Sequence, residues 1–150
     1  MGIIGFMENE IFTALLQIVT FFNQPANDEH ILAAANAPRD PNLLPIIVRV
    51  GLQPHVRVGE LASQLGKTHS STSRQLTKFE KQGLIQTEAA ADDRRARTVI
   101  LTATGQSLYD RITAVRAAKI HAVLANVPSD QQTVMLRSLQ QIAELLARVN

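Results

Sequence analysis

The sequence predicts a mainly α-helical protein with a small β-wing, in which a winged helix-turn-helix core is flanked by N- and C-terminal dimerisation helices. Three observations predict this fold class. Two helical patterns are separated by a short turn that contains glycine, two strand-like runs follow with a basic loop between them, and both ends carry apolar residues at helical spacing. We assign about 43–102 to the winged-helix lobe and about 6–23 and 103–150 to dimerisation helices, within a single domain that spans 1–150.

The N-terminal third predicts two helices joined by a polar connector. Residues 6–22 carry apolar side chains over a wide arc of a helix, which requires packing partners on more than one side. Residues 24–40 contain several Pro, Asn and Asp residues and are typical of a connector with one or two helical turns. Asp40 then caps a second helix, with Pro41 at its first position, and this helix runs to about Leu52.

The helix-turn-helix follows. Residues 55–58 can form a short strand that pairs with the wing, and residues 60–65 form a compact helix that stops at Gly66. Residues 68–82 form the next helix, which starts at a capping threonine and ends where Gly83 takes the left-handed conformation. A buried stripe recurs along this helix at three-to-five-residue spacing, and its members are Thr72, Leu76, Phe79 and Leu84.

The outward face of helix 68–82 is short, hydroxylated and basic. Small side chains let a helix approach the bases of a DNA major groove, and an arginine such as Arg74 can bridge the two acceptors of guanine. For an isolated helix, a solvated surface is the alternative interpretation of this pattern. The residues on this helix to which we assign DNA contacts are Thr68, His69, Ser70, Ser71, Ser73, Arg74, Thr77 and Lys78.

The hairpin that follows favours DNA binding. Residues 84–88 and 96–101 are strand-like, and the arginines between and just after them can reach the minor groove, where A·T-rich DNA is narrow and most negative. The formal net charge is only +2, but residues 57–97 hold eight basic and five acidic side chains, so an excess of +3 lies on the predicted contact surface. We assign wing contacts to Arg94, Arg95 and Arg97.

Two further helices are predicted after the wing. Thr102 can cap the first, in which residues 108–123 form a near-heptad apolar stripe. Ser129 and Gln132 have the spacing of a capping box for the second, whose apolar face runs through residues 136–149. Together with the N-terminal helix, these apolar faces exceed what one small core absorbs, so we expect an obligate homodimer.

Composition argues against several other classes of function. Cysteine is absent, which excludes disulfides, thiolate metal ligation and thiol-based redox switches. The four histidines show no ligand spacing, and the serines at 70–73 lack an accompanying base and acid, so we predict no metal site, no cofactor and no enzyme activity. The N-terminus lacks signal-peptide features and the apolar run 11–22 is too short and polar to span a membrane, so we expect a cytoplasmic protein with no membrane partner.

The chain resembles the MarR family of winged-helix transcriptional regulators. The resemblance is most specific in VGELASQLGKTHSSTSRQLTKFEKQGLI and in DDRRARTVILTATG, and the helical pattern extends it over nearly all 150 residues. In that family the helix that corresponds to 68–82 is the recognition helix. Asp93 and Arg95 match the family's D-x-R motif, in which the aspartate structures the wing and the arginine forms its tip. Thr72 and Thr87 depart from the pattern, which usually has an apolar residue and an arginine at these positions.

The resemblance also implies partners and a mode of action. The family is dimeric through its terminal helices and often binds small aromatic or phenolic ligands in a cleft beside the DNA-binding lobe. We therefore predict a sequence-specific dimeric transcriptional regulator of a pseudo-palindromic double-stranded DNA operator, acting as a repressor that a small organic ligand releases. The alternative is a winged-helix protein–protein interaction module that no longer binds DNA. The basic wing argues against it, since such a module has less reason to keep those arginines.

Overall fold

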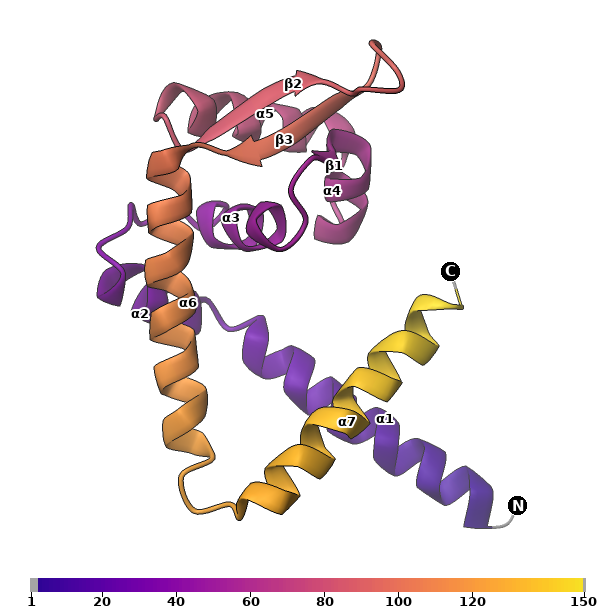
Figure 1. Cartoon of the computed structure of the whole chain (residues 1–150). Coiled ribbons are helices and arrows are strands. Elements are labelled where there is room, and N and C mark those ends of the chain that lie inside the picture. The colour runs from indigo at the N-terminus through magenta and orange to yellow at the C-terminus, as the bar shows by residue number, and fades with distance from the viewer. Residues whose placement is uncertain (1–2, 150) are drawn as a thin grey trace. The chain divides into compact units, whose positions relative to one another are not determined.

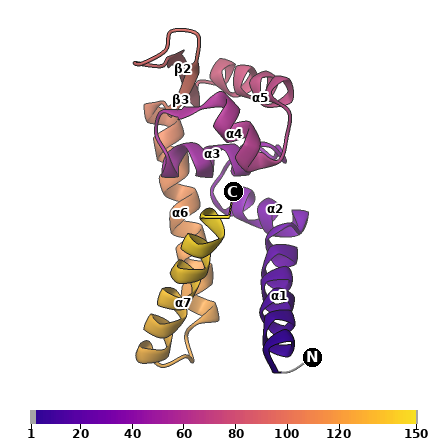
Figure 2. The same ribbon diagram turned by 90° about the vertical axis from the view of Figure 1, so that its right-hand side faces the viewer.

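The computed structural model describes residues 3–149 and is mainly helical, with one small sheet (Figures 1 and 2). The chain divides into two compact units, Met1–Val115 and Arg116–Asn150. The predicted fold class is confirmed, because a winged helix-turn-helix lies between further helices at both ends. In chain order the elements are α1 (Ile3–Phe22), α2 (Pro25–Ala34), α3 (Leu43–Leu52), β1 (Val56–Arg57), α4 (Val58–Leu65), α5 (His69–Lys81), β2 (Ile85–Ala89), β3 (Arg97–Leu101), α6 (Ala103–Val123) and α7 (Ser129–Ala147).

A three-stranded antiparallel sheet in the order β1-β3-β2 forms the wing and its base. β2 and β3 pair along their whole length, with Ala89 opposite Arg97, and β1 adds two residues, with Val56 opposite Val99. In Figure 1 the hairpin lies beside α5, and its loop extends beyond the ends of the strands. The short strand predicted to pair with the wing is therefore confirmed, although it is limited to two residues.

The core of the first unit is built from α2 to α6 and the sheet. The buried stripe predicted on α5 is confirmed, since Thr72, Leu76, Phe79 and Leu84 are all buried. Within the described residues the Thr72 hydroxyl has no hydrogen-bond partner, so an apolar side chain of the same shape would suit this position better. The largest fully buried side chains are Phe79, Leu32, Leu43, Ile47, Leu61, Leu76, Ile85, Leu108, Ile112, Val50, Val56 and Val99.

Two glycines end the helices of the helix-turn-helix with left-handed backbone. Gly66 has a φ of 64° after α4, and Gly83 has a φ of 75° after α5, as predicted. A side chain with a Cβ is strained in this conformation, so glycine allows the sharp turn from α4 into α5. α4 begins at Val58 rather than at the predicted Glu60, because the extended backbone of Arg57 leads directly from β1 into the helix.

The segment before α3 is more helical than predicted. Residues 25–34 form a ten-residue helix rather than a connector with one or two turns. Pro25 occupies the first helical position, where its missing N–H costs nothing, and the burial of Ile31 and Leu32 stabilises the helix against the core. Arg111 Nε donates to the carbonyl of Ala35 at 2.8 Å and ties α6 to the end of α2.

The start of α3 also differs from the prediction. The Asp40 carboxylate accepts the backbone N–H of Asn42 at 2.9 Å, and Leu43 N donates to the Asp40 carbonyl at 3.0 Å. These two bonds make a separate turn of residues 40–42, so Pro41 lies in that turn and α3 begins at Leu43 instead. The aspartate therefore shapes the entry to the helix without being its cap residue.

The first turn of α6 is held against the end of α5. Gly105 N donates to Thr102 Oγ1 at 3.1 Å, which confirms Thr102 as the cap, and the same hydroxyl donates to the Gly83 carbonyl at 2.5 Å. A Cβ at Gly105 would lie 1.9 Å from the Leu84 carbonyl oxygen, so only glycine fits this close approach. The wing and the long helix that follows it are therefore joined by a fixed corner.

The predicted capping box of α7 is wrong. Ser129 is the first residue of the helix and follows an N-cap at Pro128 without a side-chain bond, so its hydroxyl is not placed to cap. The Gln132 amide instead donates to the carbonyls of Leu124 and Val127, at 3.1 and 2.9 Å, and joins α7 to the end of α6. The predicted helix is present, but a different interaction fixes its start.

α1 and α7 leave most of their apolar side chains exposed. α7 has no buried residue among those described, and α1 has none between residues 5 and 22. Exposed fractions reach 70% for Phe6 on α1 and 56% for Leu136 on α7. Apolar surface on this scale is unusual on a helix that acts alone. No helix in residues 3–149 is long and apolar enough to cross a membrane.

Candidate nucleic-acid interface

α5 presents one polar face because its other face is fixed in the core. Thr68 Oγ1 accepts the backbone N–H of Ser71 at 3.1 Å and caps the helix, while Leu76 and Phe79 anchor its inner side. Of the predicted contact residues, Thr68, His69, Ser70, Ser73, Arg74, Thr77 and Lys78 are exposed and Ser71 is half-buried. The side chains predicted to contact DNA are therefore accessible along the part of α5 that does not face the core.

Two of the hydroxyls on this helix are already engaged. The Thr68 hydroxyl serves as the cap, and Thr77 Oγ1 donates to the Ser73 carbonyl at 3.0 Å within the helix. Both can still accept a hydrogen bond, but their orientation is set by the helix itself. His69, Ser70 and Arg74 make no side-chain hydrogen bond among the described residues, so their polar atoms are open to a partner.

Lys78 is held by an ion pair that sequence reasoning missed. Its Nζ lies 2.5 Å from Asp40 Oδ2, and the Asp40 side chain is only 12% exposed. Burial raises the pKa of Asp40, but the hydrogen bonds from Lys78 and Asn42 outweigh it and leave that pKa below its ordinary value. Lys78 therefore anchors α5 to the turn before α3, and less of its charge is available to a phosphate.

The wing loop is shaped by its aspartates. Asp93 Oδ1 accepts the backbone N–H of Arg95 at 3.0 Å, and the Asp93 carbonyl accepts that of Ala96 at 3.1 Å, which closes the turn. The Arg57 guanidinium holds both carboxylate oxygens of Asp92 at 2.5 Å and fixes the base of the loop to β1. Asp93 therefore holds the turn of the wing loop through its side chain and its carbonyl.

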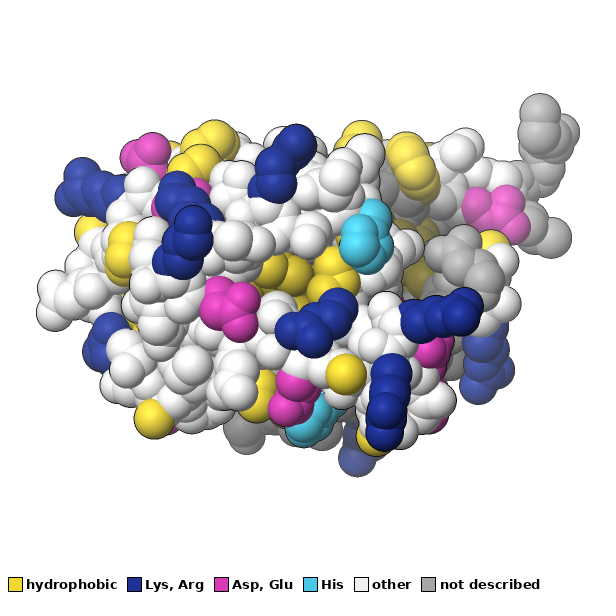
Figure 3. All heavy atoms as spheres, turned by 90° about the horizontal axis from the view of Figure 1, so that it is seen from above, with side chains coloured by type: hydrophobic (Ala, Val, Ile, Leu, Met, Phe, Trp, Pro, Cys, Tyr) yellow, Lys and Arg dark blue, Asp and Glu magenta, His cyan; other side chains and the backbone are white. Residues whose placement is uncertain are grey.

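The charges of the wing arginines are not paired with carboxylates in the described part of the chain. Arg94, Arg95 and Arg97 are exposed, and within residues 3–149 none of them forms an ion pair, nor does Arg74 on α5. Figure 3 views the face formed by α5 and the wing, where Lys and Arg side chains are spread among a few Asp and Glu side chains. A surface with several unpaired guanidinium groups attracts a polyanion.

Arg97 differs from the other two wing arginines because a hydrogen bond fixes the orientation of its side chain. Its Nη2 donates to Thr87 Oγ1 at 2.9 Å, and Glu80 Oε1 accepts the backbone N–H of Thr87 at 3.1 Å. The side chains of Glu80, Thr87 and Arg97 line a small hollow of about 90 Å³ between α5 and the sheet. Arg97 therefore lines the hollow next to α5.

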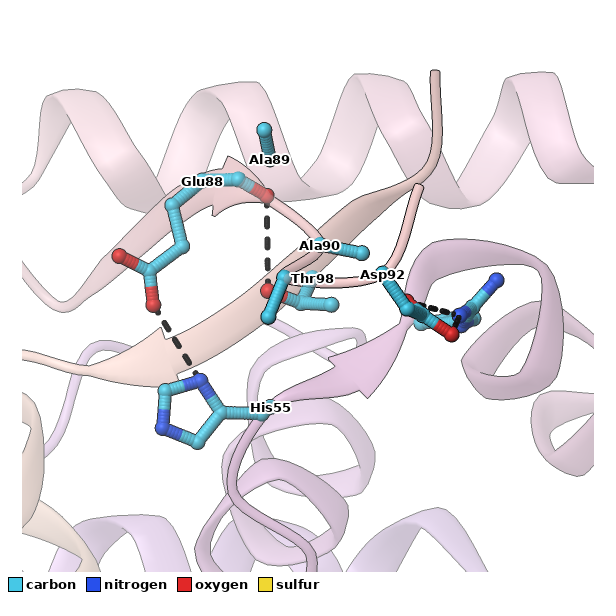
Figure 4. A pocket seen from close by; sticks show the side chains of 8 residues that line it. His55, Glu88, Ala89, Ala90, Asp92 and Thr98 are labelled. Carbon is cyan, nitrogen blue, oxygen red and sulfur yellow. Dashed lines mark hydrogen bonds and ion pairs between the residues drawn. The ribbon is translucent and has the colours of Figure 1, made fainter. Parts of the chain in front are cut away.

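A second hollow lies on the other face of the hairpin, between β1, β2 and the wing loop (Figure 4). His55 Nδ1 points toward Glu88 and lies 3.2 Å from its Oε1, while Asp92 turns toward Arg57. His55 thus pairs with Glu88, and Arg57 with Asp92, around an open depression. In the described part of the chain no three His, Cys, Asp or Glu residues are grouped as a metal site would require.

The helix-turn-helix, the basic hairpin and the exposed face of α5 define a winged-helix protein of the kind that contacts DNA with a helix and a wing. The sequence model of the MarR family matches residues 44–96, which run from α3 to the wing loop. Over these residues the chain is similar to the MarR family, as the sequence predicted.

Several solved structures share the fold of this chain. A MarR family protein from Bacillus stearothermophilus is 19% identical, with a TM-score of 0.75 over 94% of this chain and 96% of that one. A MarR transcriptional regulator from Methanosarcina mazei Go1 is 16% identical, with a TM-score of 0.73 over 94% and 99%. FabT of Streptococcus pneumoniae, solved in complex with DNA, is 19% identical, with a TM-score of 0.64 over 96% and 98%.

Sequence reasoning missed the residues that hold the interface in place. Asp40 and Arg57 pair with residues 38 and 35 positions away, on α5 and in the wing loop, and Glu80 binds Thr87 of β2, seven positions along the chain. For Arg57 a signal was present, because a residue in a strand that pairs with the wing must lie beside the wing loop. Asp40 was interpreted only as a helix cap, and nothing in its local sequence indicated Lys78 as a partner.

Proposed function

We propose that the protein is a sequence-specific DNA-binding transcriptional regulator that acts as a homodimer. The observation that carries the proposal is the placement of Arg74 and the wing arginines, all exposed and without ion pairs among the described residues, on α5 and on the hairpin beside it. α5 is the size of helix that a major groove admits, and the wing can follow the adjacent minor groove. DNA is therefore the partner that this surface suits.

The exposed apolar faces of α1 and α7 support a dimer. Obligate interfaces resemble a protein core cut in half, and long amphipathic helices at both ends of the chain can supply such a core. A two-fold dimer presents two copies of α5, so its operator is pseudo-palindromic with half-sites about one helical turn, roughly 34–36 Å, apart. A small aromatic or phenolic ligand that binds one dimer conformation better than the other would release the repressor.

The experiment is a salt titration of DNA affinity by fluorescence anisotropy. Arg74→Ala is compared with Arg95→Ala on the cognate operator and on a scrambled duplex. Loss of a guanine contact costs about 1–3 kcal/mol on the operator alone, whereas loss of a phosphate contact weakens both duplexes and lowers the salt slope by about 0.9. We expect the first pattern for Arg74→Ala and the second, with some dependence on A·T content, for Arg95→Ala.

The exposed residue Arg39 supplies a control, since Arg39→Ala removes the same charge from a residue outside α5 and the wing. If Arg74→Ala and Arg95→Ala leave operator affinity at the wild-type value at every salt concentration, DNA binding by this surface is refuted. The protein would then be a winged-helix module for protein partners.

A further inference from the structure

An acidic side chain lies on the surface that we assign to DNA. Glu80 is exposed near the C-terminal end of α5, and its carboxylate accepts the backbone N–H of Thr87 at 3.1 Å. The Thr87 hydroxyl lies 3.3 and 3.5 Å from the two Glu80 oxygens. A carboxylate beside a phosphate is electrostatically unfavourable, so its presence at this position calls for a compensating role.

The donor and acceptor groups present determine the direction of the hydrogen bonds around Thr87. A guanidinium only donates and a carboxylate only accepts, whereas a hydroxyl does both. Arg97 Nη2 donates to Thr87 Oγ1 at 2.9 Å, so the hydroxyl proton is left to point toward Glu80. The three side chains form a relay in which Glu80 orients Thr87 and Thr87 orients Arg97.

The strand register explains why the relay can form. Thr87 pairs with Val99 and Ala89 pairs with Arg97, so Thr87 and Arg97 are diagonal neighbours on one face of the hairpin. Their side chains line the same hollow as His69, Ser73 and Thr77 of α5. Arg97 is therefore held where the recognition helix meets the wing.

The position leaves most of the guanidinium free. Arg97 uses one of its five N–H donors on Thr87, and within the described residues no carboxylate lies within ion-pair distance of it. Between a helix in the major groove and a wing in the minor groove runs the sugar–phosphate backbone. A charge-assisted bond to phosphate is the interaction that a fixed, unpaired guanidinium makes there.

We propose that Arg97 clamps one backbone phosphate at the junction of α5 and the wing, and that Glu80 and Thr87 are positioning residues for this clamp. The inference rests on the proposed function and assigns a contact within it. It also predicts a change in DNA affinity on removal of Glu80 that is opposite to the one expected from its charge. Charge alone predicts stronger DNA binding when Glu80 is removed, whereas the relay predicts weaker binding.

The test compares variants of Thr87 by salt titration on operator DNA. Thr87→Val removes the hydroxyl and keeps the shape, Thr87→Ser keeps the hydroxyl, and Gln86→Val is the control on the opposite face of β2. We expect Thr87→Val to weaken binding roughly 3- to 10-fold, as for loss of one hydrogen bond, and Arg97→Ala to lower the salt slope by about 0.9. Thr87→Ser and Gln86→Val should bind like wild type.

A double-variant cycle tests the relay itself. With Arg97→Ala already present, Thr87→Val should cause no further loss, because the group that it positions is gone. Glu80→Ala should weaken operator binding in the wild-type background and not in the Arg97→Ala background. Thermal unfolding of each variant establishes that the fold is intact.

Several outcomes would overturn the inference while the proposed function stands. They are wild-type affinity of Thr87→Val, equal losses in Thr87→Val and Thr87→Ser, tighter binding by Glu80→Ala, and a full Thr87→Val loss in the Arg97→Ala background. A wild-type protein that fails to bind the operator would overturn the proposed function, and the clamp with it.

Discussion

Replacing Asp40 by Asn isolates the ion pair that ties α5 to the turn before α3. An asparagine oxygen can still accept the Asn42 N–H that Asp40 accepts at 2.9 Å, so the turn is preserved. What is lost is the charge-assisted bond to Lys78, whose Nζ lies 2.5 Å from the carboxylate. The variant therefore measures the contribution of this pair to folding stability.

The burial of the two partners sets the size of the effect. A hydrogen bond to a charged group contributes about 1.5–3 kcal/mol, whereas a fully exposed ion pair contributes about 0–1 kcal/mol. The Asp40 side chain is 12% exposed and that of Lys78 is 54% exposed, so solvent screens one side of the pair. We expect Asp40→Asn to lower the free energy of unfolding by about 1 kcal/mol, which lowers Tm by roughly 2–5 °C.

The same pair makes this loss depend on pH. Burial raises the pKa of Asp40, but hydrogen bonds from Lys78 and Asn42 outweigh it, so the pKa is lower in the folded chain than in the unfolded chain. A group with a lowered folded pKa contributes stability above its unfolded pKa, about 3.9, and loses it as the pH falls through the folded pKa. The difference between wild type and Asp40→Asn should therefore be full at pH 7 and shrink below about pH 4.

The assay is urea unfolding of wild type, Asp40→Asn, Lys78→Met and the double variant at pH 7 and near pH 3, at one fixed chain concentration. Glu29→Gln on α2 is the control, because Glu29 is an exposed carboxylate without an ion pair in the described part of the chain. At pH 7 the two losses should be less than additive. Equal losses at both pH values, or strictly additive ones, would refute the reasoning.

Three further predictions follow from the packing. Gly105→Ala should lower stability by about 1–3 kcal/mol, because a Cβ would lie 1.9 Å from a backbone oxygen; an unchanged urea midpoint would contradict this close approach. Wild type should have a dimeric mass by light scattering at micromolar concentration. Leu139→Glu on the exposed face of α7 should dissociate the dimer, whereas the control Gln140→Glu should not. A monomeric, folded wild type would disprove the dimer. Asp93→Ala should speed hydrogen exchange of the Arg95 amide and weaken operator binding. Asp93→Asn keeps the acceptor oxygen and should do neither. Equal protection of the Arg95 amide in wild type and both variants would count against a structuring role for Asp93.

The sequence alone determined the elements whose causes are local. The cap at Thr68 and the left-handed glycines at 66 and 83 follow from contacts within a few residues, and the stripe of α5 follows from the helical spacing of its side chains. The structure has each of them. The extent of α2 was missed because Pro, Asn and Asp favour both loops and helix starts. Only packing of Ile31 and Leu32 on the core decides between the two.

The orientation of the charged side chains was decided only by the tertiary structure. Lys78 and Asp40 are 38 positions apart, Arg57 and Asp92 are 35 apart, and neither pair has a sequence pattern that joins its members. Which charges neutralise each other depends on how helices and strands pack, since an ion pair needs its two groups within about 4 Å. For this reason composition could place a basic excess on residues 57–97, but only packing shows that Lys78 is anchored while Arg74, Arg95 and Arg97 keep their charge for a partner.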